Sequence, residues 1–185
     1  MKPEIAAQFP PVPVTLKNNM VAYVRPLRTT DGDLLAEMYA AITWGEFRYF
    51  CPYPLGAKTA RKNAANADTG EWTTVVIEGP DKKIGGYCWV RRFPETAPQG
   101  TFGICIRDKY QNCGAGAAII KRLLEIVRVS GPAVVDLTVQ HANTRAVILY
   151  QKMGFKIVRE QTRGTPDDPY GFDMEPEYYM EQKMS

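Results

Sequence analysis

The chain has few of the residues that build metal centres and disulfide frameworks. It contains one histidine, His141, and four cysteines, no two of which stand at Cys-x-x-Cys spacing. Structural zinc sites need closely spaced cysteine and histidine ligands, so we expect no metal site. Cys88 and Cys105 fall within expected strands, where cysteine behaves as a small buried hydrophobic residue.

Long runs of one charge and long apolar runs are also missing. The 23 basic and 20 acidic residues give a net charge of +3 and are mixed along the chain. This balance argues against nucleic acid as the main partner. No apolar stretch has transmembrane length, and the first residues, MKPE, lack the apolar core of a signal peptide. We therefore expect a cytoplasmic protein with no membrane partner.

Length and hydrophobic spacing predict one domain of strands and helices. Residues 1–19 contain four prolines and are expected to form an extended arm, which leaves residues 20–185 as a single domain. Apolar alternation and helical spacing then predict the following elements. Strands are expected at 21–27, 72–78, 83–92, 101–107, 133–139, 155–161 and 178–184, and helices at 31–42, 59–67, 115–129 and 143–153.

A turn with two glycines separates the strand expected at 101–107 from the helix expected at 115–129. Residues 111–117 of this turn read QNCGAGA. The free N–H groups and the dipole of a helix N-terminus attract phosphate, and glycines let it approach closely. The turn lacks the Gly-Lys-Ser/Thr end of a Walker loop and the third glycine of a dinucleotide loop. It is therefore either a pyrophosphate site of another kind or an ordinary tight turn.

A second motif covers the helix expected at 143–153. Asn143 suits the helix N-cap and Gly154 suits the position after its C-terminus. Asn143 and Tyr150 are seven residues apart, about two helical turns, so they are expected to face the same side.

Together, the two motifs resemble those of the GCN5-related N-acetyltransferase (GNAT) family. The first reads Gln-x-x-Gly-x-Gly, and the second reads Asn-x-x-Ala-x-x-Leu-Tyr-x-x-x-Gly-Phe. The resemblance is strongest over residues 101–158 and extends more weakly over 20–184. It implies the acyl-CoA N-acyltransferase fold of the α/β (α+β) class, with a mixed sheet of about seven strands and helices on both faces. It also implies transfer of an acetyl group from acetyl-CoA to an amine by direct attack.

The resemblance carries roles onto particular residues. Pantetheine is expected along the strand that contains Ile104, Cys105 and Ile106, with the Ile106 N–H as the catalytic donor to the thioester carbonyl. Tyr150 is expected to be the catalytic acid that protonates the departing thiolate, although a buried tyrosine can also serve packing alone. Asn143 is expected to hold the pantetheine. The cofactor loop is expected to comprise Gln111, Asn112, Cys113, Gly114, Ala115, Gly116 and Ala117.

The general base and the acceptor are less well defined. Many family members carry a glutamate on the central strand, and residues 101–106 contain no carboxylate. The lone histidine, His141, is a further candidate base, and a chain of waters can also remove the proton. The candidate carboxylates are Glu46, Glu78, Asp167, Asp168 and Asp173. Aromatic and acidic residues in two loops suit a cationic amine with an apolar body. These candidate substrate residues are Trp44, Glu46, Phe47, Tyr49 and Asp173.

Two other functions stay open. The chain can be a non-catalytic acyl-CoA sensor, since the strand carboxylate is missing, although Tyr150 argues against this. A regulator that binds another phosphate ligand is less consistent with the Asn–Tyr helix. Homodimer formation is compatible with the sequence, but no segment specifies it.

Overall fold

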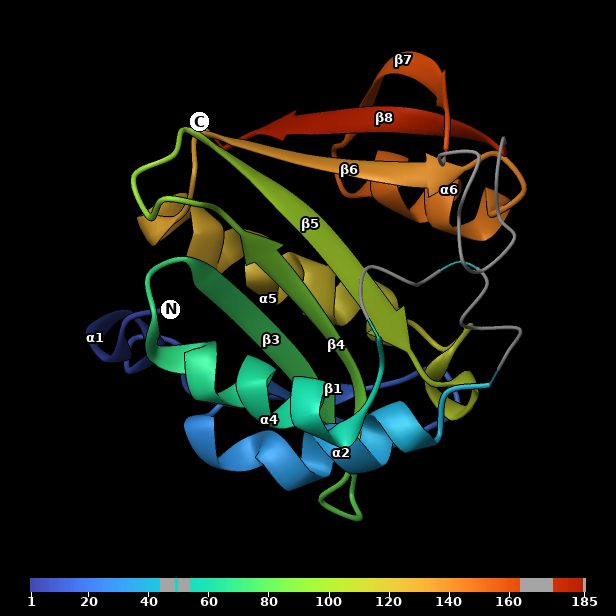
Figure 1. The fold of residues 1–185 in the computed structure, drawn as a ribbon. Helices are drawn as coiled ribbons and strands as arrows, with labels where there is room; N and C mark the ends of the chain where they lie inside the picture. Colours follow the sequence, from blue (N-terminus) through green and yellow to red (C-terminus); the bar gives the residue numbers. More distant parts are fainter. Residues whose placement is uncertain (44–48, 50–53, 164–174, 185) are drawn as a thin grey trace.

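The computed structural model describes residues 1–43, 49, 54–163 and 175–184. Their strands form one eight-stranded sheet in the order β1-β2-β3-β4-β5-β6-β8-β7 (Figure 1). Only the β5–β6 pair is parallel among the pairs in this sheet. The strands are β1 Val12–Thr15, β2 Val21–Pro26, β3 Trp72–Glu78, β4 Ile84–Arg91, β5 Gln99–Ile106, β6 Val134–Gln140, β7 Lys156–Thr162 and β8 Pro176–Lys183.

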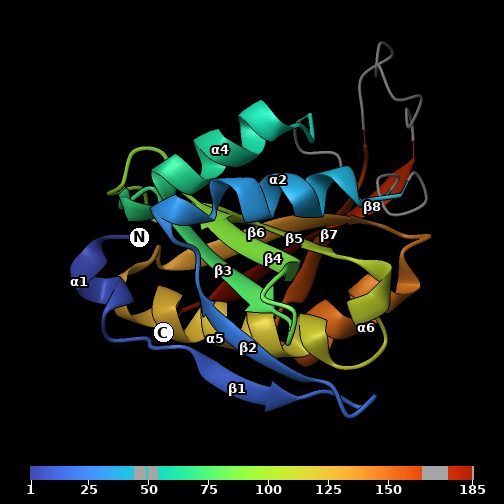
Figure 2. The same ribbon diagram turned by 90° about the horizontal axis from the view of Figure 1, so that it is seen from below.

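Helices cover both faces of the sheet. Figure 2 shows α2 and α4 on one side and α5 and α6 on the other. Each side has its own cluster of buried apolar residues, the larger one beneath α5 and the smaller one beneath α2 and α4. The α-helices are α1 Pro3–Ala6, α2 Gly32–Ala40, α4 Ala57–Ala65, α5 Ala115–Ser130 and α6 Thr144–Lys152. A mixed sheet with helices on both faces is thereby confirmed.

The N-terminal segment differs from the expected extended arm. It contains the short helix α1 and strand β1, which pairs antiparallel with β2 and brings the sheet to eight strands rather than about seven. Met1 and Leu16 are buried. Prolines are tolerated in β1 because an edge strand leaves one row of N–H groups unpaired. Prolines alone were therefore a misleading sign of an unpacked segment.

The parallel pair β5–β6 is short compared with its strands. Pairing is limited to Gln99, Gly100 and Thr101 of β5, opposite residues 134–136 of β6. Both strands continue beyond this point, β5 to Ile106 and β6 to Gln140. Figure 1 shows that they diverge from there. Within the described part of the chain, five of the eight residues of β5 therefore have a hydrogen-bonded strand on one side only.

Candidate functional site

Along β5, the peptide groups of alternate residues point toward the space where β5 and β6 separate. Arg107 N–H donates to the Gly85 carbonyl across the β4 side, over 3.0 Å. Because peptide groups alternate along a strand, those of Ile104 and Ile106 face the opposite side, where β6 has turned away. Among the described residues, the N–H groups of Ile104 and Ile106 thus have no strand partner along the diverging part of β5.

Cys105 is placed differently from its two neighbours. By the same alternation its peptide groups face Tyr87 of β4. Its side chain is buried in the cluster beneath α2 and α4. Cys105 therefore places neither its N–H nor its thiol on the side of β5 where β6 has separated.

The loop after β5 leaves a row of main-chain N–H groups free. Gly114 has a φ of +96° and Asn112 a φ of +57°, and α5 begins directly afterwards. In the described chain, the amides of residues 112–117 have no main-chain acceptor, and the first helical bond runs from Ala118 N–H to the Gly114 carbonyl, at 3.1 Å. Free amides at the start of a sixteen-residue helix suit an anion.

Small residues let the two helices of this face meet beside the loop. A Cβ on Gly116 would lie 3.2 Å from the Leu149 side chain of α6, so glycine allows the close approach. Gly114 is needed for a different reason, since its Cβ would meet nothing within 4 Å but its φ is in the left-handed region.

Cys113 contributes to the interior of the loop. Its thiol is buried and donates to the Tyr110 carbonyl, with 3.0 Å between sulfur and oxygen. Its carbonyl accepts the Lys17 N–H at 2.9 Å, so the segment before β2 braces the loop. These contacts account for the thiol and the carbonyl, which leaves the N–H of Cys113 as a potential donor among the described loop residues.

Gln111 and Arg145 connect the loop to its two neighbours. The Gln111 amide donates from Nε2 to the Ile106 carbonyl at 2.9 Å and accepts from Arg145 Nη2 at 3.2 Å. Arg145 Nη1 also donates to Asn112 Oδ1 at 2.9 Å. Sequence reasoning missed Arg145, although a cation in the first turn of a helix opposes the dipole and was a usable signal.

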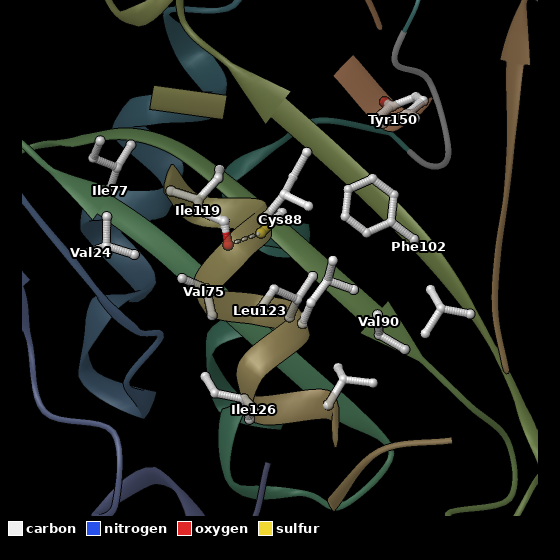
Figure 3. Packing of buried hydrophobic residues seen from close by; sticks show 14 of the residues in the cluster. Val24, Val75, Ile77, Cys88, Val90, Phe102, Ile119, Leu123, Ile126 and Tyr150 are labelled. Carbon is white, nitrogen blue, oxygen red and sulfur yellow. Dashed lines mark hydrogen bonds between the residues drawn. The ribbon is translucent and has the colours of Figure 1, made fainter. Parts of the chain in front are cut away.

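Tyr150 of α6 is buried next to the diverging part of β5. Its ring meets that of Phe102 edge-on, with 5.7 Å between centroids (Figure 3). It also meets the Phe155 ring edge-on, with 6.0 Å between centroids. Burial, with a smaller contribution from Cys88 and Cys105, raises the pKa of the phenol well above its ordinary value. The hydroxyl has no hydrogen bond to any described residue. Tyr150 therefore supplies a neutral, uncommitted O–H donor.

Asn143 begins α6 through its main chain rather than its side chain. Its carbonyl accepts from Ala146 at 3.0 Å and Val147 at 3.1 Å. Asn143 is the N-cap residue, as expected, but its side chain makes no capping hydrogen bond. The Asn143 amide is therefore not used up by its own helix.

The described residues narrow the choice of base. Glu78 is engaged by Arg25, 2.8 Å away, and by Lys82, 3.5 Å away, so its carboxylate is committed to an ion-pair network. His141 stacks on Tyr178 with ring centroids 3.8 Å apart, and its Nε2 is buried without a hydrogen-bond partner among the described residues.

Among the candidate substrate residues, Tyr49 is partly buried. The candidates Trp44, Glu46, Phe47, Asp167, Asp168 and Asp173 lie outside the described residues.

A pocket of about 340 Å³ lies between α5 and α6 and begins at the end of the loop. Three basic side chains surround its apolar floor. It is lined by Ala117, Ala118, Lys121, Leu124, Arg128, Lys152 and Met153. This combination suits a flat apolar group that carries negative charge.

The described part of the chain lacks two features, a metal site and a membrane-spanning helix. It contains no group of three or more residues able to hold a metal ion. None of its helices is both long and apolar enough to cross a membrane.

The fold and the loop define a class of acyl-CoA-dependent transferases, and sequence comparison agrees. Residues 70–157 match the family described as acetyltransferase (GNAT) domain. This part of the chain contains both motifs, and its match to the GNAT acetyltransferase family confirms the resemblance that they carry.

Solved structures of this family share the fold. A GNAT-family acetyltransferase from Streptococcus pneumoniae has a TM-score of 0.70 and 22% identity, covering 89% of this chain and 99% of that one. Ribosomal-protein-S5-alanine acetyltransferase from Vibrio fischeri has a TM-score of 0.75 at 12% identity, covering 89% and 93%. Spermidine N-acetyltransferase from Vibrio cholerae, in complex with CoA and spermine, has a TM-score of 0.70 at 17% identity, covering 88% and 95%.

Proposed function

We propose that the protein transfers an acetyl group from acetyl-CoA to a primary amine of a small molecule or a protein, by direct attack in a ternary complex. One observation carries the proposal: in the described chain, the N–H groups of Ile104 and Ile106, which have no strand partner, are followed by the free amides of residues 112–117. A strand-like pantetheine followed by a diphosphate has the same order of chemical groups. The similar protein from Vibrio cholerae was solved with CoA and a polyamine.

The thioester would lie beside the diverging part of β5. Its carbonyl oxygen would accept a hydrogen bond from the Ile106 N–H. The Ile104 N–H, two residues earlier in the strand, has the same orientation and is the alternative donor. This donor would stabilise the negative charge that develops on the oxygen as the amine attacks. The Asn143 amide, free of its own helix, would bind the pantetheine from the α6 side.

The chemical step would form a C–N bond and break the C–S bond. The amine nitrogen attacks the carbonyl carbon, and the electron pair of the C–S bond leaves with sulfur. Tyr150 would hydrogen-bond to that sulfur and donate its proton. Burial raises the pKa of the phenol, so it is a weak acid, and it would regain its proton through water from the acylated nitrogen. The ammonium proton would leave through water, because Glu78 is held by Arg25 and positioning is the larger need of this reaction.

The two ends of the site would hold the cofactor's nucleotide and the acceptor. The nucleotide end of the cofactor would extend from the loop toward the basic pocket between α5 and α6. The acceptor would be a cationic amine with an apolar body, bound by the aromatic and acidic loops that contain Trp44, Glu46, Phe47, Tyr49 and Asp173. We further propose that the enzyme is cytoplasmic, since no feature of its composition calls for another compartment.

Thiol release tests this function. Purified protein is incubated with acetyl-CoA and a panel of amines, including polyamines, amino acid derivatives and peptides with free N-termini. We expect release that depends on one class of amine, with the acetylated product identified by mass spectrometry. Binding of acetyl-CoA with no release from any amine would favour the alternative, a non-catalytic acyl-CoA sensor.

A further inference from the structure

Arg145 occupies the junction between the cofactor loop and α6. Its two terminal nitrogens donate to two different loop residues, Asn112 at 2.9 Å and Gln111 at 3.2 Å. Gln111 in turn holds the Ile106 carbonyl at the end of β5. The guanidinium therefore contacts the two loop residues at which the row of free amides begins.

The partners of Arg145 leave its charge available. Both are neutral amide oxygens, and no carboxylate is among the partners that the described residues provide. Arg25, by contrast, is paired with the carboxylates of Asp31 and Glu78. The side chain of Arg145 is exposed, so a ligand can reach it. A guanidinium has five N–H donors, and these two hydrogen bonds use only two of them.

The position of Arg145 in α6 has a local cost. A cation in the first turn of a helix meets the positive end of the helix dipole. An anion placed between the loop amides and the guanidinium would offset this repulsion. Arginine also matches the oxygens of a phosphate group with two parallel hydrogen bonds.

We propose that Arg145 binds the diphosphate of coenzyme A from the α6 side, opposite the loop amides. The inference rests on the proposed function and adds a charged residue to a loop that otherwise offers main-chain donors. Arg145 would then have two tasks. It would fix the Gln111 amide that orients the end of β5, and it would neutralise part of the diphosphate charge.

Calorimetric titration of two variants with two ligands tests the proposal. Arg145→Gln removes the charge, and Arg145→Lys keeps the charge but lacks the planar guanidinium with its parallel N–H donors. We expect Arg145→Gln to bind CoA and 3′-dephospho-CoA about tenfold more weakly than the wild type, as for loss of one charged hydrogen bond. Arg145→Lys should recover part of this loss, because it keeps the positive charge but cannot make the two parallel hydrogen bonds. A matched control is Arg61→Gln, which removes an exposed arginine that lies 3.0 Å from Asp33 and should leave both affinities unchanged.

Three results would overturn the proposal. Unchanged affinity of Arg145→Gln would show that the guanidinium does not contact the cofactor. A loss confined to CoA would assign Arg145 to the 3′-phosphate instead of the diphosphate. Equal losses in the glutamine and lysine variants would show that the charge of residue 145 does not act on the diphosphate. Failure of the wild type to bind CoA would instead refute the proposed function itself.

Discussion

The ring of Tyr150 meets the ring of Phe102 edge-on, with 5.7 Å between centroids and 80° between planes. This contact joins α6 to β5 just after the last β5–β6 pair, at Thr101. It places a protonated phenol beside the strand whose peptide groups are proposed to bind the thioester.

Replacing Tyr150 by phenylalanine separates the hydroxyl from the ring. The Phe102 and Phe155 contacts are retained in Tyr150→Phe, so we expect cofactor affinity to stay within twofold of the wild type, about the size of an ordinary surface substitution. Turnover should fall by about a hundredfold, the lower range for loss of a general acid. Steady-state thiol release and calorimetry measure the two quantities. Unaltered turnover would remove Tyr150 from the mechanism.

The raised pKa of Tyr150 also predicts how stability depends on pH. An unfolded tyrosine loses its proton near pH 10, whereas the native phenol keeps it to higher pH. The native state then binds more protons than the unfolded state, so this contribution is complete below pH 10 and is lost as pH rises further. Denaturation at increasing pH should show the wild type losing stability relative to Tyr150→Phe. Parallel curves for the two proteins above pH 10 would contradict the burial of this phenol.

Gly114 tests the anion site with a matched pair of variants. Gly114→Gln and Gly114→Glu share the strain of a left-handed φ, which costs about 1–2 kcal/mol for a residue with a Cβ. Only the glutamate adds repulsion toward phosphate. We expect the glutamine variant to retain measurable acetyl-CoA binding and the glutamate variant to lose it. Equal affinities in calorimetry would mean that the diphosphate binds elsewhere.

The fold away from the site depends on a buried ion pair. Arg25 lies 2.7 Å from Asp31 and 2.8 Å from Glu78, and both Arg25 and Asp31 are buried. Arg25→Met leaves two carboxylates without their cation, which should reduce the free energy of unfolding by about 3–5 kcal/mol. Chemical denaturation measures this effect.

Arg61→Met is the control for that measurement. Its pair with Asp33 is exposed and screened by solvent, so little stability should be lost. A similar small loss for both variants would show that burial does not set the cost of removing Arg25.

Local pattern predicted most of the fold and the outline of the site. Alternation identified β3 at its observed bounds, and helical spacing placed α5 within one residue, because both elements bury a regular apolar face. β1 was missed because its pairing with β2 depends on an edge position that prolines tolerate and that no spacing rule reveals.

The finer parts of the site depend on contacts between distant residues. Arg145 meets Asn112 across 33 positions of the chain, and neither motif encodes that contact. Likewise, the sequence does not reveal that Glu78 pairs with Arg25. This ion pair is the reason that Glu78 is not a free base. Such pairings follow from the folded topology, so only the structure supplies them.

Titration of the purified protein with acetyl-CoA in a calorimeter tests the central claim most directly. Free loop amides and the unpaired edge of β5 predict one site per chain with micromolar affinity. Absence of binding at millimolar acetyl-CoA would contradict the account, because the loop and the strand would then hold no acyl-CoA.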